Sequence, residues 1–172
     1  MAACIKPVLT LVATTFIPML ELRASIPLGC FTPSIRDALG FTGVVATCFV
    51  SNVLFGMAVF EAMALAEGVL LRFGWFERRI WPMLLRRREM LRDKVEKYGI
   101  WGVSIFIGIP LPGTGAMAGA MASYLLHLDR KRFWLANLVG VFAAAVAVAA
   151  VCMLIEQGAV GEDSLVRRLF LK

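Results

Sequence analysis

Two charged side chains stand inside an apolar run near the start of the sequence. Glu21 and Arg23 belong to the stretch PMLELRASIPLG, which runs from Pro18 to Gly29. A guanidinium binds phosphate or carboxylate oxygens at two points and keeps its charge. A carboxyl group in low-dielectric surroundings exchanges protons nearer to neutral pH than one in water. The pair is therefore suited to coupling an anionic cargo to protons, and a structural ion pair between two helices is the alternative.

A second stretch, PLPGTGAMAGAMAS, combines prolines and glycines without a charged residue. Pro110, Pro112 and Thr114 predict a break, followed by a new helix N-terminus at about Gly115. The free N–H groups of such an end carry partial positive charge and bind anions. We therefore expect Gly113, Thr114 and Gly115 to contact the cargo. The spacing of Gly115 and Gly119 is also typical of closely packed membrane helices, which is the simpler interpretation of these two glycines.

Three further polar residues lie in apolar helices. Asn52 and Asn137 could contact the cargo or form hydrogen bonds between helices, and the sequence favours the second role at least equally. Glu61 lies toward the cytoplasmic end of its helix, where it is either a second proton site or a side chain that extends to the interface.

The sequence offers little for metal or cofactor chemistry. The four cysteines, Cys4, Cys30, Cys48 and Cys152, have no paired spacing, and His127 is the only histidine. We read the cysteines as small apolar side chains, and we expect no metal site, no disulfide framework and no enzymatic activity. The string GTGAMA matches a dinucleotide fingerprint, but no strand precedes it and no acidic residue follows at the required distance, so we expect no cofactor.

The composition predicts an integral membrane protein. Of the 172 residues, 60% are hydrophobic and only 17% are charged, well away from the average of soluble domains. Four apolar blocks cover 7–31, 42–71, 98–127 and 133–155. The second and fourth are long enough to cross a bilayer as helices. The first and third are broken by Pro18, Pro27, Pro110 and Pro112, and broken backbone at membrane depth must be surrounded by protein or a watered cavity.

The two halves of the sequence echo one another. Pro27 to Asn52 and Pro112 to Asn137 both span 25 positions (52 − 27 and 137 − 112). Broken blocks in corresponding positions of two halves are typical of transporters with internal repeats. We therefore predict an all-α integral membrane protein in a single domain, 1–172, built of two inverted repeats. Each repeat is a re-entrant helical hairpin (7–31 and 98–127) followed by a transmembrane helix (42–71 and 133–155).

The charges give the expected orientation. The segment 72–97 holds nine Lys or Arg and four acidic residues, which predicts a basic cytoplasmic helix between the repeats. Re-entrant hairpins place 12 basic residues inside and 5 outside, and four full crossings place 13 inside and 4 outside, so the charge rule does not choose. Four crossings would leave Glu21 and Arg23 in the middle of a simple spanning helix, which favours the hairpins. We expect a multi-pass protein of the cell (inner) membrane, with a surface-bound tail at 158–172.

These residues resemble a known family. ELRASIPLG, then SN in the next helix, then KYGIWGVSIFIGIPLPGTGAMAGAMAS are similar to the small multi-drug export proteins, thought to be distant relatives of the DedA membrane proteins. The resemblance runs from about Phe16 to Asn137. DedA relatives are similar to proton-dependent carriers of polyprenyl phosphate and other lipids, with paired re-entrant hairpins. The resemblance implies that Glu21 and Arg23 are the required charges and that 112–115 is the second hairpin tip. The second arginine of DedA proteins is lacking, so Gly113, Thr114 and a helix end would take its place.

The first expectation is a transporter or flippase for an anionic lipid or small molecule, similar to polyprenyl phosphate and coupled to protons. A proton-coupled small multidrug exporter of cationic compounds is the second, and a membrane assembly subunit without cargo is the third. The expected partners are membrane lipids, the anionic cargo and a second copy of the chain in a homodimer, with no nucleic acid. The homodimer follows because two full crossings leave the hairpin tips in need of a protein lining.

Overall fold

The described part of the chain is entirely helical. The structure is a computed structural model that describes residues 2–18, 20–70, 99–109 and 114–156, and six helices lie within these ranges. The all-helical class predicted from the sequence is confirmed. The basic segment 72–97 and the tail 158–172 lie outside the described residues, as do Pro110, Pro112 and Gly113.

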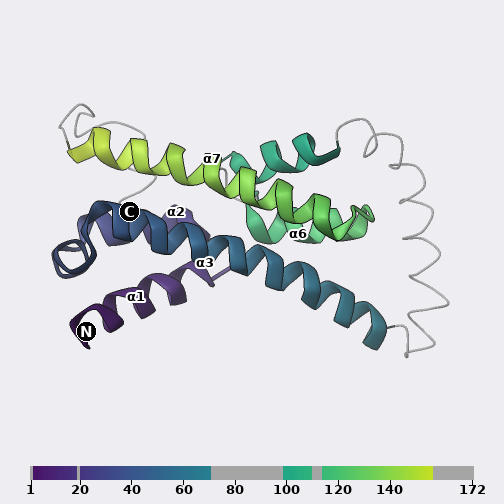
Figure 1. Cartoon of the computed structure of the whole chain (residues 1–172), viewed down its shortest axis with the longest axis horizontal. Helices are drawn as coiled ribbons and strands as arrows, with labels where there is room; N and C mark the ends of the chain where they lie inside the picture. Colours follow the sequence, from purple (N-terminus) through teal and green to yellow (C-terminus); the bar gives the residue numbers. More distant parts are fainter. Residues whose placement is uncertain (1, 19, 71–98, 110–113, 157–172) are drawn as a thin grey trace.

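The first apolar block doubles back on itself. Helix α1 (Ala2–Thr15) runs to a turn that contains Pro18, and helix α2 (Glu21–Phe31) returns along it, in contact with α1. Figure 1 shows both helices beside the first half of α3. The prediction that Pro27 breaks this hairpin is wrong, because Pro27 lies inside α2. One missing N–H does not end a helix whose neighbours hold it in place.

The two longest described helices form the body of the molecule. Helix α3 (Pro33–Leu70) is kinked at Gly40, where φ is 67° and ψ is 168°. Helix α7 (Arg130–Glu156) runs alongside it (Figure 1). Residues 41–67 and 130–156 each give about 40 Å of helix at about 1.5 Å per residue, more than the roughly 30 Å of a bilayer's hydrocarbon. By length and composition, both α3 and α7 can cross a membrane.

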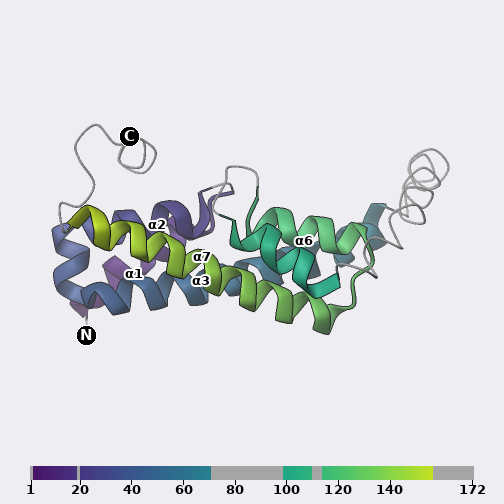
Figure 2. The same cartoon turned by 90° about the horizontal axis from the view of Figure 1, so that it is seen from above.

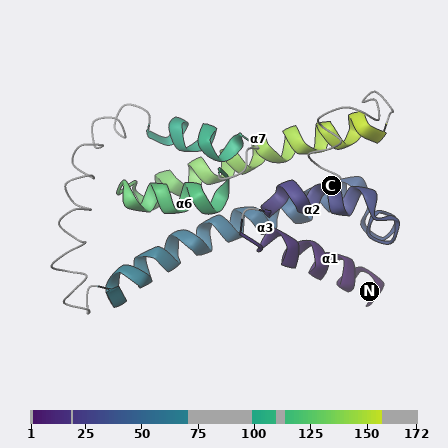
Figure 3. The ribbon, with the colours of Figure 1, turned by 180° about the vertical axis from the view of Figure 1, so that it is seen from behind.

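The second broken block is also a pair of helices. Helix α6 (Ala116–Leu125) lies beside α7 and the second half of α3, and the helix Gly99–Gly108 packs against α6 and α7. Figures 2 and 3 show the first hairpin at one end of the long helices and this pair at the other, with their tips facing near the middle. The pairs thus approach each other from opposite ends. Their re-entry into a membrane and their relation by an inverted repeat stay predictions.

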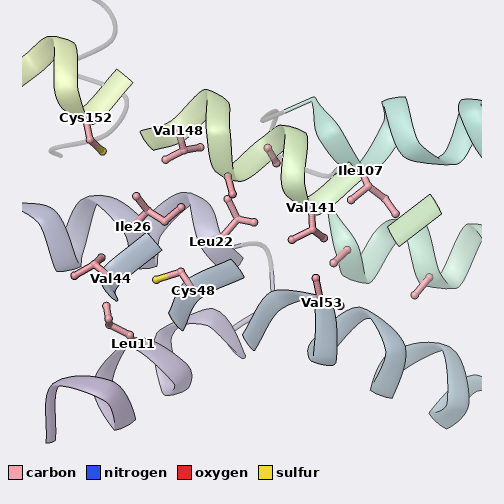
Figure 4. Packing of buried hydrophobic residues seen from close by; sticks show 14 of the residues in the cluster. Leu11, Leu22, Ile26, Val44, Cys48, Val53, Ile107, Val141, Val148 and Cys152 are labelled. Atoms are coloured by element: carbon pink, nitrogen blue, oxygen red, sulfur yellow. The ribbon is translucent and has the colours of Figure 1, made fainter. Parts of the chain in front are cut away.

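Small residues allow the helices to pack closely around an apolar core. Figure 4 shows Leu11, Leu22 and Val44 in the part of the core around the first hairpin, and Ile107 and Val141 in the other. A Cβ at Gly119 would overlap Ile107, and one at Gly140 would lie 2.7 Å from the Ser104 carbonyl oxygen. The outer faces are also apolar, as expected where lipid replaces water; they expose Val50, Leu54, Leu65, Trp101, Ile105, Leu135, Phe142 and Val146.

Candidate functional site

The Glu21 carboxylate binds the N-terminus of α6. Glu21 is the first residue of α2 and is almost fully buried, with 3% of its surface exposed. The backbone N–H of Ala116 donates to Oε2 at 2.9 Å, and the N–H of Met117 donates to Oε1 at 3.0 Å. N–H groups in the first turn of a helix lack intrahelical partners and carry its positive end. The carboxylate of one hairpin therefore caps a helix of the other.

Gly115 makes room for this contact. Its φ of 119° and ψ of −172° fall in a region that is essentially open to glycine alone. A Cβ at this position would also overlap the Glu21 carboxylate. Glu21 itself has a φ of 46°, rare for a residue with a side chain, at the point where the turn enters α2. The two backbones thus hold unusual conformations on both sides of the contact.

Arg23 joins the same two hairpins at a second point. Its Nη2 donates to Oγ1 of Thr114 at 2.8 Å and to the carbonyl oxygen of Ile109 at 3.3 Å. The Thr114 hydroxyl donates in turn to the Ile109 carbonyl oxygen at 2.7 Å. Ile109 and Thr114 are the described residues on either side of the second tip. Glu21, Arg23, Thr114 and Gly115, singled out from the sequence, thus meet in one site, which we call the tip junction.

The tip junction confirms the predicted helix start and adds a contact that the sequence did not indicate. The sequence placed an anion-binding helix end at about Gly115, and α6 begins one residue later, at Ala116. The first two amides of that end are already bound to a carboxylate of the chain itself. An external phosphate or carboxylate can reach these amides only when Glu21 has left them. An external anion at these donors would therefore have to displace the Glu21 carboxylate.

The two asparagines lie between α3 and α7. Nδ2 of Asn137 donates to the Val53 carbonyl oxygen at 3.0 Å, and a Cβ at Gly56 would overlap its amide. Asn52 lies one helical turn before Gly56 on α3 and is 1% exposed. Neither amide atom of Asn52, nor Oδ1 of Asn137, has a hydrogen-bond partner within the described ranges. Asn137 thus serves the interhelical role considered from the sequence, and Asn52 is a buried amide open to a polar partner.

Glu61 is not part of the tip junction. Its Oε1 lies 2.6 Å from Nε of Arg130, and both side chains are partly exposed. It follows Asn52 by nine residues, which is about 13 Å along the helix. The partner of Glu61 is thus Arg130, the first residue of α7, rather than a residue of the tip junction.

The sequence reading missed a buried hydroxyl pair in the first hairpin. Thr15 at the end of α1 donates to Oγ of Ser25 on α2 at 2.9 Å, and both residues are fully buried. Cys48 of α3 lies against them. Ser and Thr form such bonds between membrane helices. The sequence signal was a hydroxyl residue on each arm of a predicted hairpin, which gives a pairing only when the turn between them is known.

The tip junction and both asparagines fall within a family match. A profile of the protein family described as "Putative small multi-drug export protein" matches residues 21–147, which is 127 of 172 residues (147 − 21 + 1). The match begins at Glu21 and ends inside α7. Comparisons with curated proteins and with solved structures gave no match.

Proposed function

The chain belongs to this family of small multi-drug export proteins and is a membrane protein, and from that premise we propose that it transports a molecule with an anionic head through the tip junction. The cargo class is an anionic lipid or small molecule, such as a polyprenyl phosphate. The observation that carries this proposal is the Glu21 carboxylate on the first two amides of α6. A site that holds one carboxylate with two N–H donors suits the oxygens of another carboxylate or of a phosphate.

Arg23 supplies the second half of an anion site. Its guanidinium lies at the same tip, bound through Nη2 to neutral oxygens of Thr114 and Ile109. A phosphate between the α6 amides and this guanidinium would receive charged and neutral donors from two helices. Bidentate contacts of this kind are the strong ones among protein hydrogen bonds. Thr114 and Gly115 then take the place that a second arginine holds in the DedA proteins, whose similarity to this chain stays a prediction.

Proton coupling follows from competition at the amides. A proton on Glu21 removes the charge that the α6 N-terminus attracts, so the carboxyl group leaves more easily. The cargo's head then takes the free amides. When the cargo departs, Glu21 loses its proton and returns. The site would thus alternate between two states. In one, Glu21 is protonated and the anionic head occupies the α6 amides; in the other, no cargo is bound and the Glu21 carboxylate occupies them.

The membrane placement belongs to the same proposal. With α1–α2 and the second helix pair re-entering from opposite faces, the tip junction lies near mid-bilayer depth, away from lipid tails. The chain would be a multi-pass protein of the inner membrane, with the basic segment in the cytoplasm. A homodimer would cover the open side of the tips. Labelling of Ser34→Cys, Met90→Cys and Lys131→Cys from each side tests the topology, and re-entry requires that positions 90 and 131 react from one face.

Export of cationic drugs is the second candidate, favoured by the family's description. In that case Glu21, once released from α6, would bind the cation directly, and Arg23 would only adjust the strength of that binding. The guanidinium at the same tip repels a cation, so the geometry favours the anion.

Proteoliposomes separate these candidates. Two probes suffice, phosphatidic acid with a nitrobenzoxadiazole-labelled chain, read by dithionite quenching, and ethidium, read by fluorescence. We expect Arg23→Gln to abolish movement of the labelled phosphatidic acid, and Glu21→Gln to remove its dependence on an imposed pH gradient. Arg36→Gln is the matched control, because Arg36 pairs with Glu156 at the far end of α7. Ethidium transport by the wild-type chain that Arg23→Gln leaves intact would support the drug exporter, and no transport of either probe would support a non-transporting assembly subunit.

A further inference from the structure

Cys30 and Cys152 lie side by side although 122 positions separate them in the sequence (152 − 30). Cys30 is near the end of α2 and Cys152 is near the end of α7, and these two helices are in contact. Both cysteines are free and buried, with 5% and 1% of their surfaces exposed, and their thiols are within hydrogen-bonding reach of each other. Figure 4 shows the Cys152 side chain pointing from α7 toward α2. The two thiols therefore face each other across the contact between α2 and α7.

An ion pair borders the two thiols. Arg36 and Glu156 are 2.8 Å apart, and both side chains are about one-third exposed. Glu156 follows Cys152 by one helical turn, and the Arg36 guanidinium reaches the Cys30 thiol. A neighbouring guanidinium stabilises a thiolate, the form that attacks disulfides. The thiol pair thus has a cation beside it and a short path to the water at this end of the molecule.

In the topology proposed above, the charge pattern places this end in an oxidising compartment. The basic segment 72–97 follows the opposite end of α3, and such segments stay in the cytoplasm. Arg36, Glu156 and the cysteines therefore belong to the extracytoplasmic side. Disulfides form and persist there and are rare in the cytosol.

We propose that Cys30 and Cys152 form a disulfide that fastens the first hairpin to α7 on the extracytoplasmic side. The Cys30 thiolate attacks the disulfide of an extracytoplasmic thiol oxidant and releases one thiolate of the oxidant. The Cys152 thiolate then attacks Sγ of Cys30 and releases the second. Two protons and two electrons pass to the oxidant, which becomes a dithiol. The closed bond holds α2 on α7, so it restrains the hairpin that carries Glu21 and Arg23.

Mass spectrometry tests this independently of any transport activity. The full-length chain, with Cys4→Ser to remove the thiol near the N-terminus, is treated with diamide in membranes and in detergent micelles. Free thiols are then alkylated and the chain is digested. We expect a linked peptide pair that contains Cys30 and Cys152, lost in Cys30→Ala and in Cys152→Ala. Cys48→Ala is the matched control, since Cys48 is equally buried and lies on α3, and it should keep the link.

The outcomes are decisive in both directions. A link in most chains, reversed by dithiothreitol and accompanied by a higher thermal midpoint, supports the proposal. Alkylation of both Cys30 and Cys152 after diamide treatment in membranes and in micelles overturns it, as does a link from Cys30 to Cys48. Where transport is also measured, arrest on oxidation and recovery on reduction would show that the first hairpin moves during the cycle. That last readout depends on the proposed function, and the peptide link does not.

Discussion

Removing the charge of Glu21 should loosen the N-terminus of α6. The carboxylate accepts two N–H bonds, from Ala116 and Met117, and is almost fully buried. Hydrogen bonds to a charged group contribute about 1.5–3 kcal/mol each, and a charge at a helix end contributes up to about 2 kcal/mol in a partly buried site. Glu21→Gln keeps one acceptor oxygen and turns an NH₂ group toward the other amide. We therefore expect the tip junction to be weakened by about 2–4 kcal/mol.

Hydrogen exchange measures this loss at the two amides concerned. A weakening of about 2–4 kcal/mol raises the population of the open tip by about 30- to 1000-fold, since 1.4 kcal/mol is a factor of ten. Exchange at Ala116 and Met117 should accelerate accordingly in detergent or nanodiscs, and the thermal midpoint should fall. Glu61→Gln is the matched control, because an exposed ion pair contributes only about 0–1 kcal/mol. Unchanged exchange at both amides in Glu21→Gln would refute the capping role and the competition derived from it.

Three further substitutions test separate contacts. Holding alanine in the backbone conformation of Gly115 costs roughly 1–3 kcal/mol. Gly115→Ala should destabilise the chain by more than this, because the new Cβ also overlaps the Glu21 carboxylate. Gly40→Ala is the control, because Gly40 also has a positive φ but no atom lies within 4 Å of the new Cβ, so this variant carries the backbone cost alone. Equal losses of thermal stability in Gly40→Ala and Gly115→Ala would contradict the overlap with Glu21. Gly56→Ala should lower the thermal midpoint by displacing the Asn137 amide from Val53, at a cost of about 1–3 kcal/mol, and an unchanged midpoint would show that α7 adjusts freely. Asn52→Leu should leave the thermal midpoint equal or higher, because it removes two buried unpaired amide atoms, yet abolish movement of the labelled phosphatidic acid; full transport would assign Asn52 no part in the path.

Much of the local structure could be predicted from the sequence. The break before Gly115 and the start of α6 at Ala116 follow from prolines and glycines that act on their own neighbours. The long apolar runs predicted α7 to within three residues at its ends, whereas α3 begins at Pro33, well before the expected start at 42, and is kinked at Gly40. Pro27 was misread because a proline breaks an isolated helix, whereas α2 is held by α1, α3 and α7 around it.

Contacts between residues far apart in the sequence could not be predicted from it. Glu21 and Ala116 are 95 positions apart, and their contact depends on how two hairpins meet. The sequence indicated a carboxylate and a helix end separately, and nothing in their spacing indicated that one caps the other. Cys30 and Cys152 raise the same difficulty, since they have no paired spacing in the sequence and only tertiary packing brings them together. Asn52 and Asn137 occupy matching positions in the two halves, each 25 residues after a proline, yet they are not paired with each other. The Asn137 amide lies at Gly56, one helical turn away from Asn52.

The distribution of polar contacts bears on which part of the molecule would move in the proposed transport cycle. Along most of their lengths the helices meet through apolar side chains and glycines, together with neutral bonds such as Thr15–Ser25, and such packing resists sliding because every displaced atom meets another. At the tip junction, by contrast, the hairpins are joined by polar bonds of Glu21 and Arg23, and under the proposed coupling a proton on Glu21 would weaken the two bonds that its carboxylate accepts. Asn137 meanwhile ties α7 to the backbone of α3 with a neutral bond that no proton removes. A transport cycle built on this chain would therefore open at the tips while α3 and α7 stay together, and the cargo would pass between the hairpins.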